Sequence, residues 1–293
     1  MNNFLPSELI LNEDSSVYHL KLLPSDVADI IIVVGDPNRV SEVSKHFNSI
    51  ELKKTNREFV THTGRLGDKR ISVISTGIGV ANIDIVFNEL DILSSINLLN
   101  SSVKEQKRKF KIIRLGTTGS LSPDIPLDCI LFSKYAIGID GIPHHYECNE
   151  NLFENDLAQL FTSQTKWPEK LAFPYAVEAS KDLWEQLYES KFKAGITLTM
   201  NGFYAPQGRQ LRIPIKYPGI LNSYKEVNYK NYQLTNLEME TAGLYAFGKI
   251  FDHQVISISA VLANRFTGEF SAKPQRTIEG MIDLILQKVK LLK

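Results

Sequence analysis

Residues 30–39 read IIIVVGDPNR, a short apolar run that ends in a turn. The branched residues Ile30–Val34 predict a strand that is buried on both faces. Gly35 suits a tight turn, Asp36 is placed to cap a helix, and Pro37 suits the first helical position. The stretch therefore predicts a strand followed directly by a helix, which is the repeating unit of an α/β fold.

The same order of apolar run, glycine turn and helix recurs along the chain. Residues 57–63 and 70–75 alternate as strands around a hairpin turn at 66–69. Residues 76–79, Thr-Gly-Ile-Gly, lead into a helical pattern over Val80–Leu93, and Lys111–Leu115 predicts a strand that ends in a turn at Gly116–Gly119.

The rest of the chain continues this alternation. Further strands are predicted at Cys129–Ile137, Gly195–Met200 and Val255–Leu262, further helices at Lys181–Phe192, Met239–Phe251 and Thr277–Leu292, and a loop or flap at 206–232. We expect one α/β domain over residues 1–293, with a central mixed β-sheet flanked by helices and residues 1–16 as an N-terminal extension.

Charge and composition limit the kinds of molecule that this protein is expected to bind. The 293 residues hold 33 Lys and Arg against 33 Asp and Glu, so no net charge attracts nucleic acid or a membrane surface. The two cysteines have no CxxC spacing, the first residues lack a signal-peptide pattern, and no apolar stretch is long enough to span a membrane. We expect a soluble cytoplasmic protein with a small-molecule partner.

Three glycine turns follow predicted strands, at 35–39, 77–79 and 114–119. Because ligands of open α/β sheets bind at the carboxyl ends of strands, these turns are expected to meet at one crevice. Their backbone N–H groups, with Arg39, Arg114 and Thr117 nearby, suit a phosphate ion. Each turn alone is more often only a turn, and none matches a nucleotide-triphosphate or dinucleotide motif.

Two further groups suit a nucleoside-like ligand. Glu238-Met239-Glu240 could hold the hydroxyls of a sugar, although a glutamate at a helix start is more often a partner of the helix dipole. Phe203-Tyr204, with Gln207 and Arg209, could stack and hydrogen-bond a planar base, or could be a loop with two buried aromatic residues. His19 alone indicates a surface or capped histidine.

The order of these motifs resembles the uridine phosphorylases of the nucleoside phosphorylase family. The resemblance extends from His19 to Arg265 and rests on Val17–Leu20, Gly35–Arg39, Arg57–Phe59, Ser75–Gly79, Arg114–Gly119, Phe203-Tyr204 with Gln207 and Arg209, Glu238–Glu240 and Asn264-Arg265. It implies a fold like that of the nucleoside phosphorylases and a pentosyltransferase that cleaves uridine with phosphate into uracil and ribose 1-phosphate.

The resemblance also implies a role for each matching residue. Phosphate would be bound by Gly35, Arg39, Arg114 and Thr117, with Arg57 of a neighbouring subunit; ribose by Glu238, Met239 and Glu240, with His19 of the neighbour at the 5′-hydroxyl; and the base by Phe203, Gln207, Arg209 and Arg265. The chain would then be a homo-oligomer, at least a dimer, with shared active sites. Whether it forms a dimer or a hexamer stays open.

This chain departs from the family pattern at two places. Val80-Ala81-Asn82 replaces the Gly-Pro-Ser that commonly follows Gly-Ile-Gly, in a region where some relatives bind potassium beside the counterpart of Glu58. The ion is therefore not transferred to this chain. His144 and His145 replace small residues, and we expect a structural role for them because no acidic or cysteine partner stands at ligand spacing.

The chemistry requires no cofactor, and phosphate acts as a co-substrate. Gln207 and Arg209 would stabilise negative charge on the departing base, while Arg114 and Glu240 would act on phosphate and ribose. Purine-cleaving relatives use an aspartate after the late strand, and here residues 259–265 contain no carboxylate. The alternatives are a purine nucleoside phosphorylase or nucleosidase of the same fold, or a non-catalytic nucleoside-binding protein; the preference among uridine, thymidine and deoxyuridine stays open.

Overall fold

A computed structural model describes residues 4–293. The helices are α1 (Pro37–Ser44), α2 (Val80–Ser95), α3 (Asn155–Thr165), α4 (Lys181–Leu187), α5 (Ile220–Ser223), α6 (Thr241–Ile250) and α7 (Pro274–Lys290). The strands are β1 (Ile30–Val34), β2 (Ser49–Asn56), β3 (Phe59–Leu66), β4 (Lys69–Ser75), β5 (Ile96–Asn97), β6 (Ser102–Val103), β7 (Lys111–Ser120), β8 (Ile130–Gly138), β9 (Tyr175–Glu178), β10 (Lys193–Thr199), β11 (Asn228–Tyr229), β12 (Tyr232–Glu238) and β13 (Gln254–Asn264). Single-turn 3₁₀ helices lie at Pro24–Asp26, Ile142–His145, Glu150–Leu152 and Tyr224–Glu226.

The stretch 30–39 forms the predicted strand and helix. Ile30–Val34 is β1, and its four last residues are buried. The Asp36 side chain accepts a hydrogen bond from the Asn38 N–H at 2.9 Å and so caps α1, with Pro37 in the first helical position. The backbone N–H groups at the start of α1 therefore face the carboxyl end of β1.

The sheet is mixed, as predicted, and part of it closes on itself. The strand order is β11-β12-β10-β8-β13-β7-β1-β4-β3-β2, and β12 also pairs with β7. This extra pairing, with Leu237 opposite Gly119, joins β7, β13, β8, β10 and β12 into a small closed barrel. The closure places the carboxyl ends of β7 and β12 beside each other.

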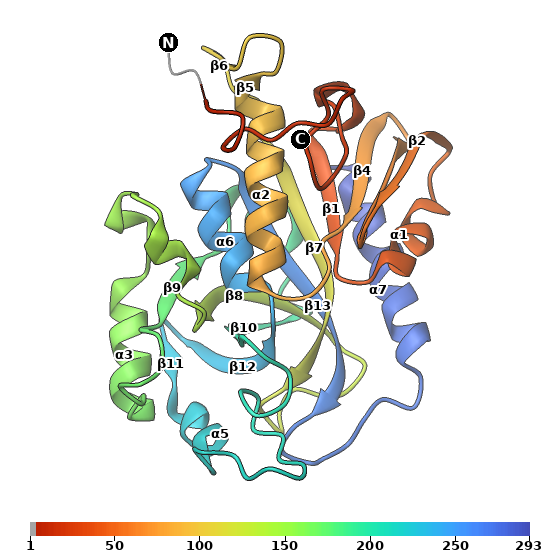
Figure 1. The fold of residues 1–293 in the computed structure, drawn as a ribbon. Coiled ribbons are helices and arrows are strands. Elements are labelled where there is room, and N and C mark those ends of the chain that lie inside the picture. The colour runs from red at the N-terminus through yellow and green to blue at the C-terminus, as the bar shows by residue number, and fades with distance from the viewer. Residues whose placement is uncertain (1–3) are drawn as a thin grey trace.

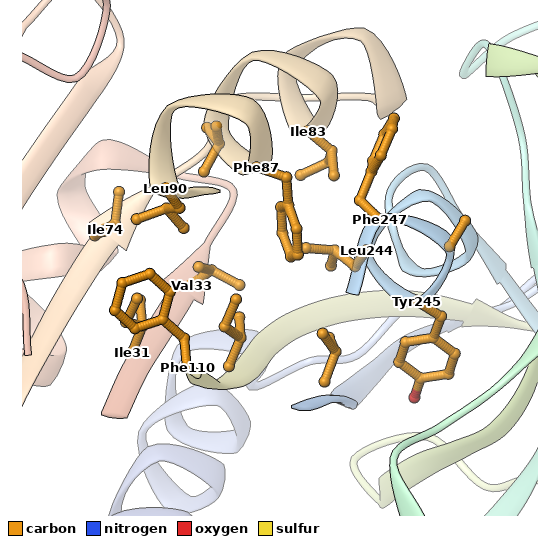
Figure 2. Packing of buried hydrophobic residues seen from close by; sticks show 14 of the residues in the cluster. Ile31, Val33, Ile74, Ile83, Phe87, Leu90, Phe110, Leu244, Tyr245 and Phe247 are labelled. Carbon is orange, nitrogen blue, oxygen red and sulfur yellow. The ribbon is translucent and has the colours of Figure 1, made fainter. Parts of the chain in front are cut away.

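Alternating side chains of β1 belong to two different cores. Ile31 and Val33 pack with residues of α2 and α6, as Figure 2 shows, whereas Ile32 and Val34 pack with residues of α1, α4 and α7. Helices therefore cover both faces of this part of the sheet (Figure 1). A strand that is buried on both faces explains the unbroken apolar run in the sequence.

The structure corrects the prediction of a turn at Gly116–Gly119. These residues continue β7, which pairs in parallel with β13 as far as Asn264 opposite Ser120. Gly116 leaves room for a side chain within the strand, since an added Cβ there would lie 1.8 Å from the Arg114 guanidinium. The third glycine motif thus contributes a strand surface, and not a turn.

Other predictions are confirmed with shifted boundaries. The hairpin of β3 and β4 and the helix from Val80 are present, whereas α4 ends at Leu187, short of the predicted Phe192. The strands β2, β9 and β12 and the helix α3 were not predicted. Residues 206–219 contain no regular element, as expected of a loop, but the short elements α5 and β11 follow within the predicted flap.

The described part of the N-terminal extension is held against the domain. The Asn12 amide donates to the Val17 carbonyl oxygen at 2.9 Å, and Leu9 is buried. Among residues 4–293, no helix is both long and apolar enough to cross a bilayer.

Candidate active site

A cavity of about 720 Å³ lies at the carboxyl ends of β1, β7, β12 and β13. It is lined by most of the site residues predicted from the sequence, namely Gly35, Arg39, Arg114, Thr117, Phe203, Gln207, Arg209, Glu238, Met239 and Glu240. His19, Arg57 and Arg265 are not among its lining residues. Segments that are distant in the sequence thus meet at one crevice, as the strand-end argument predicts.

Arg114 is a buried residue that lines this cavity. Its guanidinium donates to Glu240 at 2.7 Å and lies 3.0 Å from Glu238, and it also donates to the Ser259 hydroxyl at 3.2 Å. Burial alone would lower the pKa of Arg114, but the two carboxylates raise it above its ordinary value. The guanidinium is therefore held charged and in one orientation.

Glu238 and Glu240 lie where β12 turns into α6. The Glu238 carboxylate accepts hydrogen bonds from the backbone N–H groups of Glu240 and Thr241 and from the Thr199 hydroxyl. It therefore caps α6, which is the structural alternative considered for this motif. Glu240 accepts from the Gly79 N–H at 2.8 Å as well as from Arg114.

Glu240 is buried beside Arg114 and a second carboxylate, Glu238. Burial raises its pKa and the Glu238 charge adds to this effect, whereas Arg114 opposes it. One guanidinium cannot neutralise two buried carboxylates completely, which explains the direction of the shift. A hydroxyl that donates to Glu240 would lower the cost of its charge.

The first two glycine turns lie against each other and beside Arg39. An added Cβ on Gly35 would lie 3.5 Å from the Gly77 carbonyl oxygen, and Gly79, with φ of 89°, precedes α2. The Arg39 Nε is buried without a hydrogen-bond partner within residues 4–293. Burial lowers the pKa of Arg39, Asp36 opposes this shift and the Arg114 charge adds to it, so an anion between the two arginines would relieve their repulsion.

At residues 203–209 the cavity is lined by an aromatic ring, an amide and a guanidinium. The Arg209 guanidinium lies 3.8 Å from the centre of the Phe203 ring and donates to the Phe203 carbonyl oxygen at 2.6 Å. It also donates to the side-chain oxygen of the buried Gln207, which leaves the Gln207 amide nitrogen free to donate elsewhere. Burial and the nearby Arg265 lower the pKa of Arg209 to about 10.

Phe203 and Tyr204 are exposed by 50% and 58%, so the alternative of a loop with two buried aromatic residues is wrong. Arg265 lies behind this group and donates to the Gln207 backbone carbonyl at 3.2 Å. The loop therefore presents aromatic surface, an amide and a guanidinium together.

His19 and Arg57 lie next to each other on a surface outside the cavity. Arg57 is in the turn between β2 and β3, with φ of 53°, and its guanidinium lies 5.4 Å from the centre of the Tyr18 ring. The Asn56 amide donates to the His19 carbonyl oxygen at 2.7 Å. The two residues that the resemblance places in a neighbouring subunit's site thus form one surface cluster.

Several cavity residues were not predicted. Glu58, Ile78 and Asn82 line the cavity beside recognised motifs, and Leu262 and Ala263 come from the end of β13. Phe270 has no sequence signal; it reaches the cavity because it forms a bridge with Ala263. His144 and His145 are exposed in a 3₁₀ helix and are not among the lining residues.

The chain belongs to the phosphorylase superfamily, whose family model matches residues 29–284. It is 29% identical to the uridine phosphorylase of Thermococcus kodakarensis over 92% of this chain and 85% of that protein. It is 25% identical to a DeoD-type purine nucleoside phosphorylase of Buchnera aphidicola, over 94% and 99% of the two chains. A Trypanosoma brucei nucleoside phosphorylase with uridine phosphorylase activity superposes with a TM-score of 0.85 at 26% identity, covering 97% of this chain and all of that one.

These matches confirm the nucleoside phosphorylase fold and the resemblance to uridine phosphorylases. They include both pyrimidine and purine phosphorylases. The choice of base therefore depends on the residues of this cavity.

Proposed function

We propose that this protein is a pyrimidine nucleoside phosphorylase, a pentosyltransferase that converts uridine and phosphate into uracil and ribose 1-phosphate. The observation that supports this most is one cavity that holds the buried Arg114 and the half-buried Arg39 beside two carboxylates. On the Phe203–Arg209 loop the same cavity holds an amide and a guanidinium beside an aromatic ring. Such a cavity offers groups for an anion, a polyol and a planar base at once.

In the proposed reaction, phosphate lies between Arg39 and Arg114, near Gly35 and Thr117, with Arg57 of a neighbour completing its binding. A phosphate oxygen forms the bond to the anomeric carbon while the bond to the base nitrogen breaks and its electron pair leaves with the base. Charge opposite in sign to the cationic sugar is thereby held close to it, without a covalent enzyme intermediate.

The sugar and the base have separate partners in this scheme. Glu240 accepts from a ribose hydroxyl, Met239 contacts the ring, and Glu238 fixes the helix start and Arg114. Gln207 and Arg209 donate to the uracil carbonyls, and these hydrogen bonds strengthen as the base becomes anionic. Because Arg209 already holds the Gln207 oxygen, the Gln207 amide nitrogen is oriented before substrate arrives.

A pyrimidine fits the cavity better than a purine. No carboxylate stands in residues 259–265 to protonate a purine nitrogen. The only amide in this segment, Asn264, is occupied, because its oxygen accepts from the Phe266 and Thr267 N–H groups and its nitrogen donates to Ser122. Arg265 favours carbonyl acceptors on the base.

We also propose an oligomeric state, a cellular location and a cofactor requirement for this protein. Residues 1–293 act as one domain, and the protein forms a homo-oligomer in which His19 and Arg57 of one subunit complete the cavity of another. It works in the cytoplasm, which the two free cysteines Cys129 and Cys148 suit, and it needs phosphate but no cofactor or metal.

The test measures base release from uridine, thymidine, deoxyuridine and inosine, each with and without phosphate. We expect uracil and ribose 1-phosphate in equal amounts only when phosphate is present, and inosine to react at least about 100-fold more slowly. Hydrolysis without phosphate would indicate a nucleosidase, faster reaction of inosine would indicate a purine enzyme, and uridine binding without products would indicate a nucleoside-binding protein.

A further inference from the structure

One buried carboxylate of α2 organises the loop that contains His19. Glu89 is 6% exposed and is not among the residues that line the cavity. Its Oε1 accepts from both the backbone N–H and the ring Nδ1 of His19, each at 2.7 Å, and its Oε2 accepts from the Leu20 N–H at 2.7 Å. Three donors therefore converge on the two oxygens of Glu89.

These contacts fix the orientation and the proton of the imidazole ring. Because a carboxylate only accepts, the His19 Nδ1 must carry the hydrogen in this pair. In the neutral ring Nε2 is then left with a lone pair and can accept a hydrogen bond from outside. The His19 side chain keeps 26% of its surface exposed, so a ligand can reach it.

The rest of the loop is also held in place before any ligand binds. The Asn56 amide donates to the His19 carbonyl at 2.7 Å, and the His19 ring meets the buried Phe59 edge-on with 6.4 Å between ring centres. Because a carboxylate, a backbone contact and a ring contact already fix His19, little further conformational entropy is lost when it binds a ligand.

We infer that Glu89 is a positioning residue that presents His19 Nε2 as the acceptor for the nucleoside 5′-hydroxyl in a neighbouring subunit's site. The inference depends on the proposed function, because it needs a nucleoside as substrate. Glu89 itself does not contact the substrate; it acts by selecting the tautomer and the direction of the His19 ring.

The kinetic test compares uridine with 5′-deoxyuridine, which lacks the hydroxyl in question. In Glu89→Gln an amide nitrogen replaces one acceptor oxygen and must face at least one of the three N–H donors, so the loop loses a hydrogen bond and His19 is held less firmly. We expect kcat/KM for uridine to fall about tenfold and that for 5′-deoxyuridine to change less than about twofold, as in His19→Ala. The double variant is expected to be no worse than His19→Ala alone.

Asp91→Asn provides a matched control. Asp91 lies on the same helix and binds the Ser94 and Ser95 hydroxyls, not His19, so the preference for uridine should stay at the wild-type value. If Glu89→Gln lowered kcat/KM equally for both substrates, Glu89 would have a general structural role and the inference would be wrong.

A second readout does not depend on catalysis. Nitrogen NMR of the His19 ring in mildly alkaline buffer should show the hydrogen on Nδ1 in the wild-type protein, and a shift toward Nε2 or a mixture in Glu89→Gln. Wild-type protein with the hydrogen on Nε2 would overturn the inference even if uridine is cleaved. Failure to cleave uridine, with the Nδ1 tautomer observed, would instead overturn the proposed function.

Discussion

At Gly116 a single methyl group would occupy the space of the Arg114 guanidinium. An added Cβ would lie 1.8 Å from Nη1 and 2.4 Å from Cζ of Arg114. The guanidinium cannot easily move aside, because Glu238 and Glu240 hold it. The glycine is therefore required by a close approach of a side chain and not by its backbone conformation.

Gly116→Ala is expected to raise the KM for phosphate at least about tenfold and to lower the free energy of unfolding by about 1–3 kcal/mol. Phosphate saturation kinetics and urea denaturation measure the two effects. Gly280→Ala in α7 is the control, since an added Cβ there meets nothing within 4 Å and should slightly stabilise the protein. An unchanged KM for phosphate in Gly116→Ala would contradict the role of Arg114.

His253 predicts a pH dependence of stability. It is 7% exposed, its ring lies 5.0 Å from that of Phe110, and burial lowers its pKa to about 4 from the ordinary 6.5. Between these values the unfolded chain binds a proton that the folded protein does not. The free energy of unfolding should thus decrease by about 3 kcal/mol as the pH falls through this range because of His253 alone.

His253→Gln should remove this part of the pH dependence. Urea denaturation of wild type and variant at several values between about pH 4 and 7.5 gives the difference, in which the titration of other groups cancels. His145→Gln, a change at an exposed histidine, is expected to keep the wild-type dependence. Parallel curves for wild type and His253→Gln would show that His253 does not contribute.

At the scale of elements, Asp36 connects helix formation to anion binding. It caps α1, and Arg39 lies in the first turn of the same helix. Asp36→Ala should lower the free energy of unfolding by about 1 kcal/mol and raise the KM for phosphate, because the helix start loosens. Asp36→Asn, which retains an accepting oxygen, should preserve most of the stability; equal losses in both variants would exclude the cap as the cause.

The elements that could be predicted from the sequence are those whose apolar residues follow a regular pattern of burial. Ile30–Val34 is buried on both faces and Val80–Ser95 has a continuous apolar stripe, so both patterns were unambiguous. β2 was missed because its side chains are exposed or half-buried and its sequence, SIELKKTN, resembles a polar connection. The extent of β7 was missed because glycines in a strand pattern often mark an irregularity, whereas here Gly116 leaves room for the Arg114 side chain of the same strand.

The candidate site was predictable where motifs follow strands in the sequence. Arg39 and Arg114 could be placed together because the carboxyl ends of their strands meet. Glu240 was assigned to the same site only by the resemblance, since the strand before it was not predicted. Phe270 could not, because only the tertiary bridge to Ala263 brings it to the cavity. The Glu89–His19 pair joins residues 70 positions apart, and no local pattern indicates such a contact.

At the scale of the whole molecule, the surface position of His19 and Arg57 leads to a mixing experiment. Arg57→Ala and Arg114→Ala should each be inactive, but hybrid dimers contain one site in which both arginines are present. Random reassembly should therefore restore about a quarter of the wild-type activity. The measurement is uridine phosphorolysis after the two proteins are dissociated, mixed and reassembled.

A mixture of Arg39→Ala with Arg114→Ala serves as the control. Both arginines belong to the same side of the site, so no hybrid contains a complete one and activity should stay absent. Since Arg114→Ala leaves two buried carboxylates unpaired and could fold poorly, Arg39→Ala can replace it in the mixture with Arg57→Ala. Folded hybrids without recovered activity would exclude a shared site.

The closed barrel leaves the sheet with little free edge. At one end of the strand order stands β11, which has two residues, and at the other stands β2, whose Lys53, Lys54 and Glu51 place charge along the border. Further edges belong to the four-residue strand β9, which pairs only with β8, and to the two-residue strands β5 and β6. Short strands and charged strands both discourage main-chain pairing with a further copy. Growth of this protein into fibrils by adding strand to strand is therefore disfavoured in the native state, whereas association through side chains on faces and loops permits assemblies of finite size.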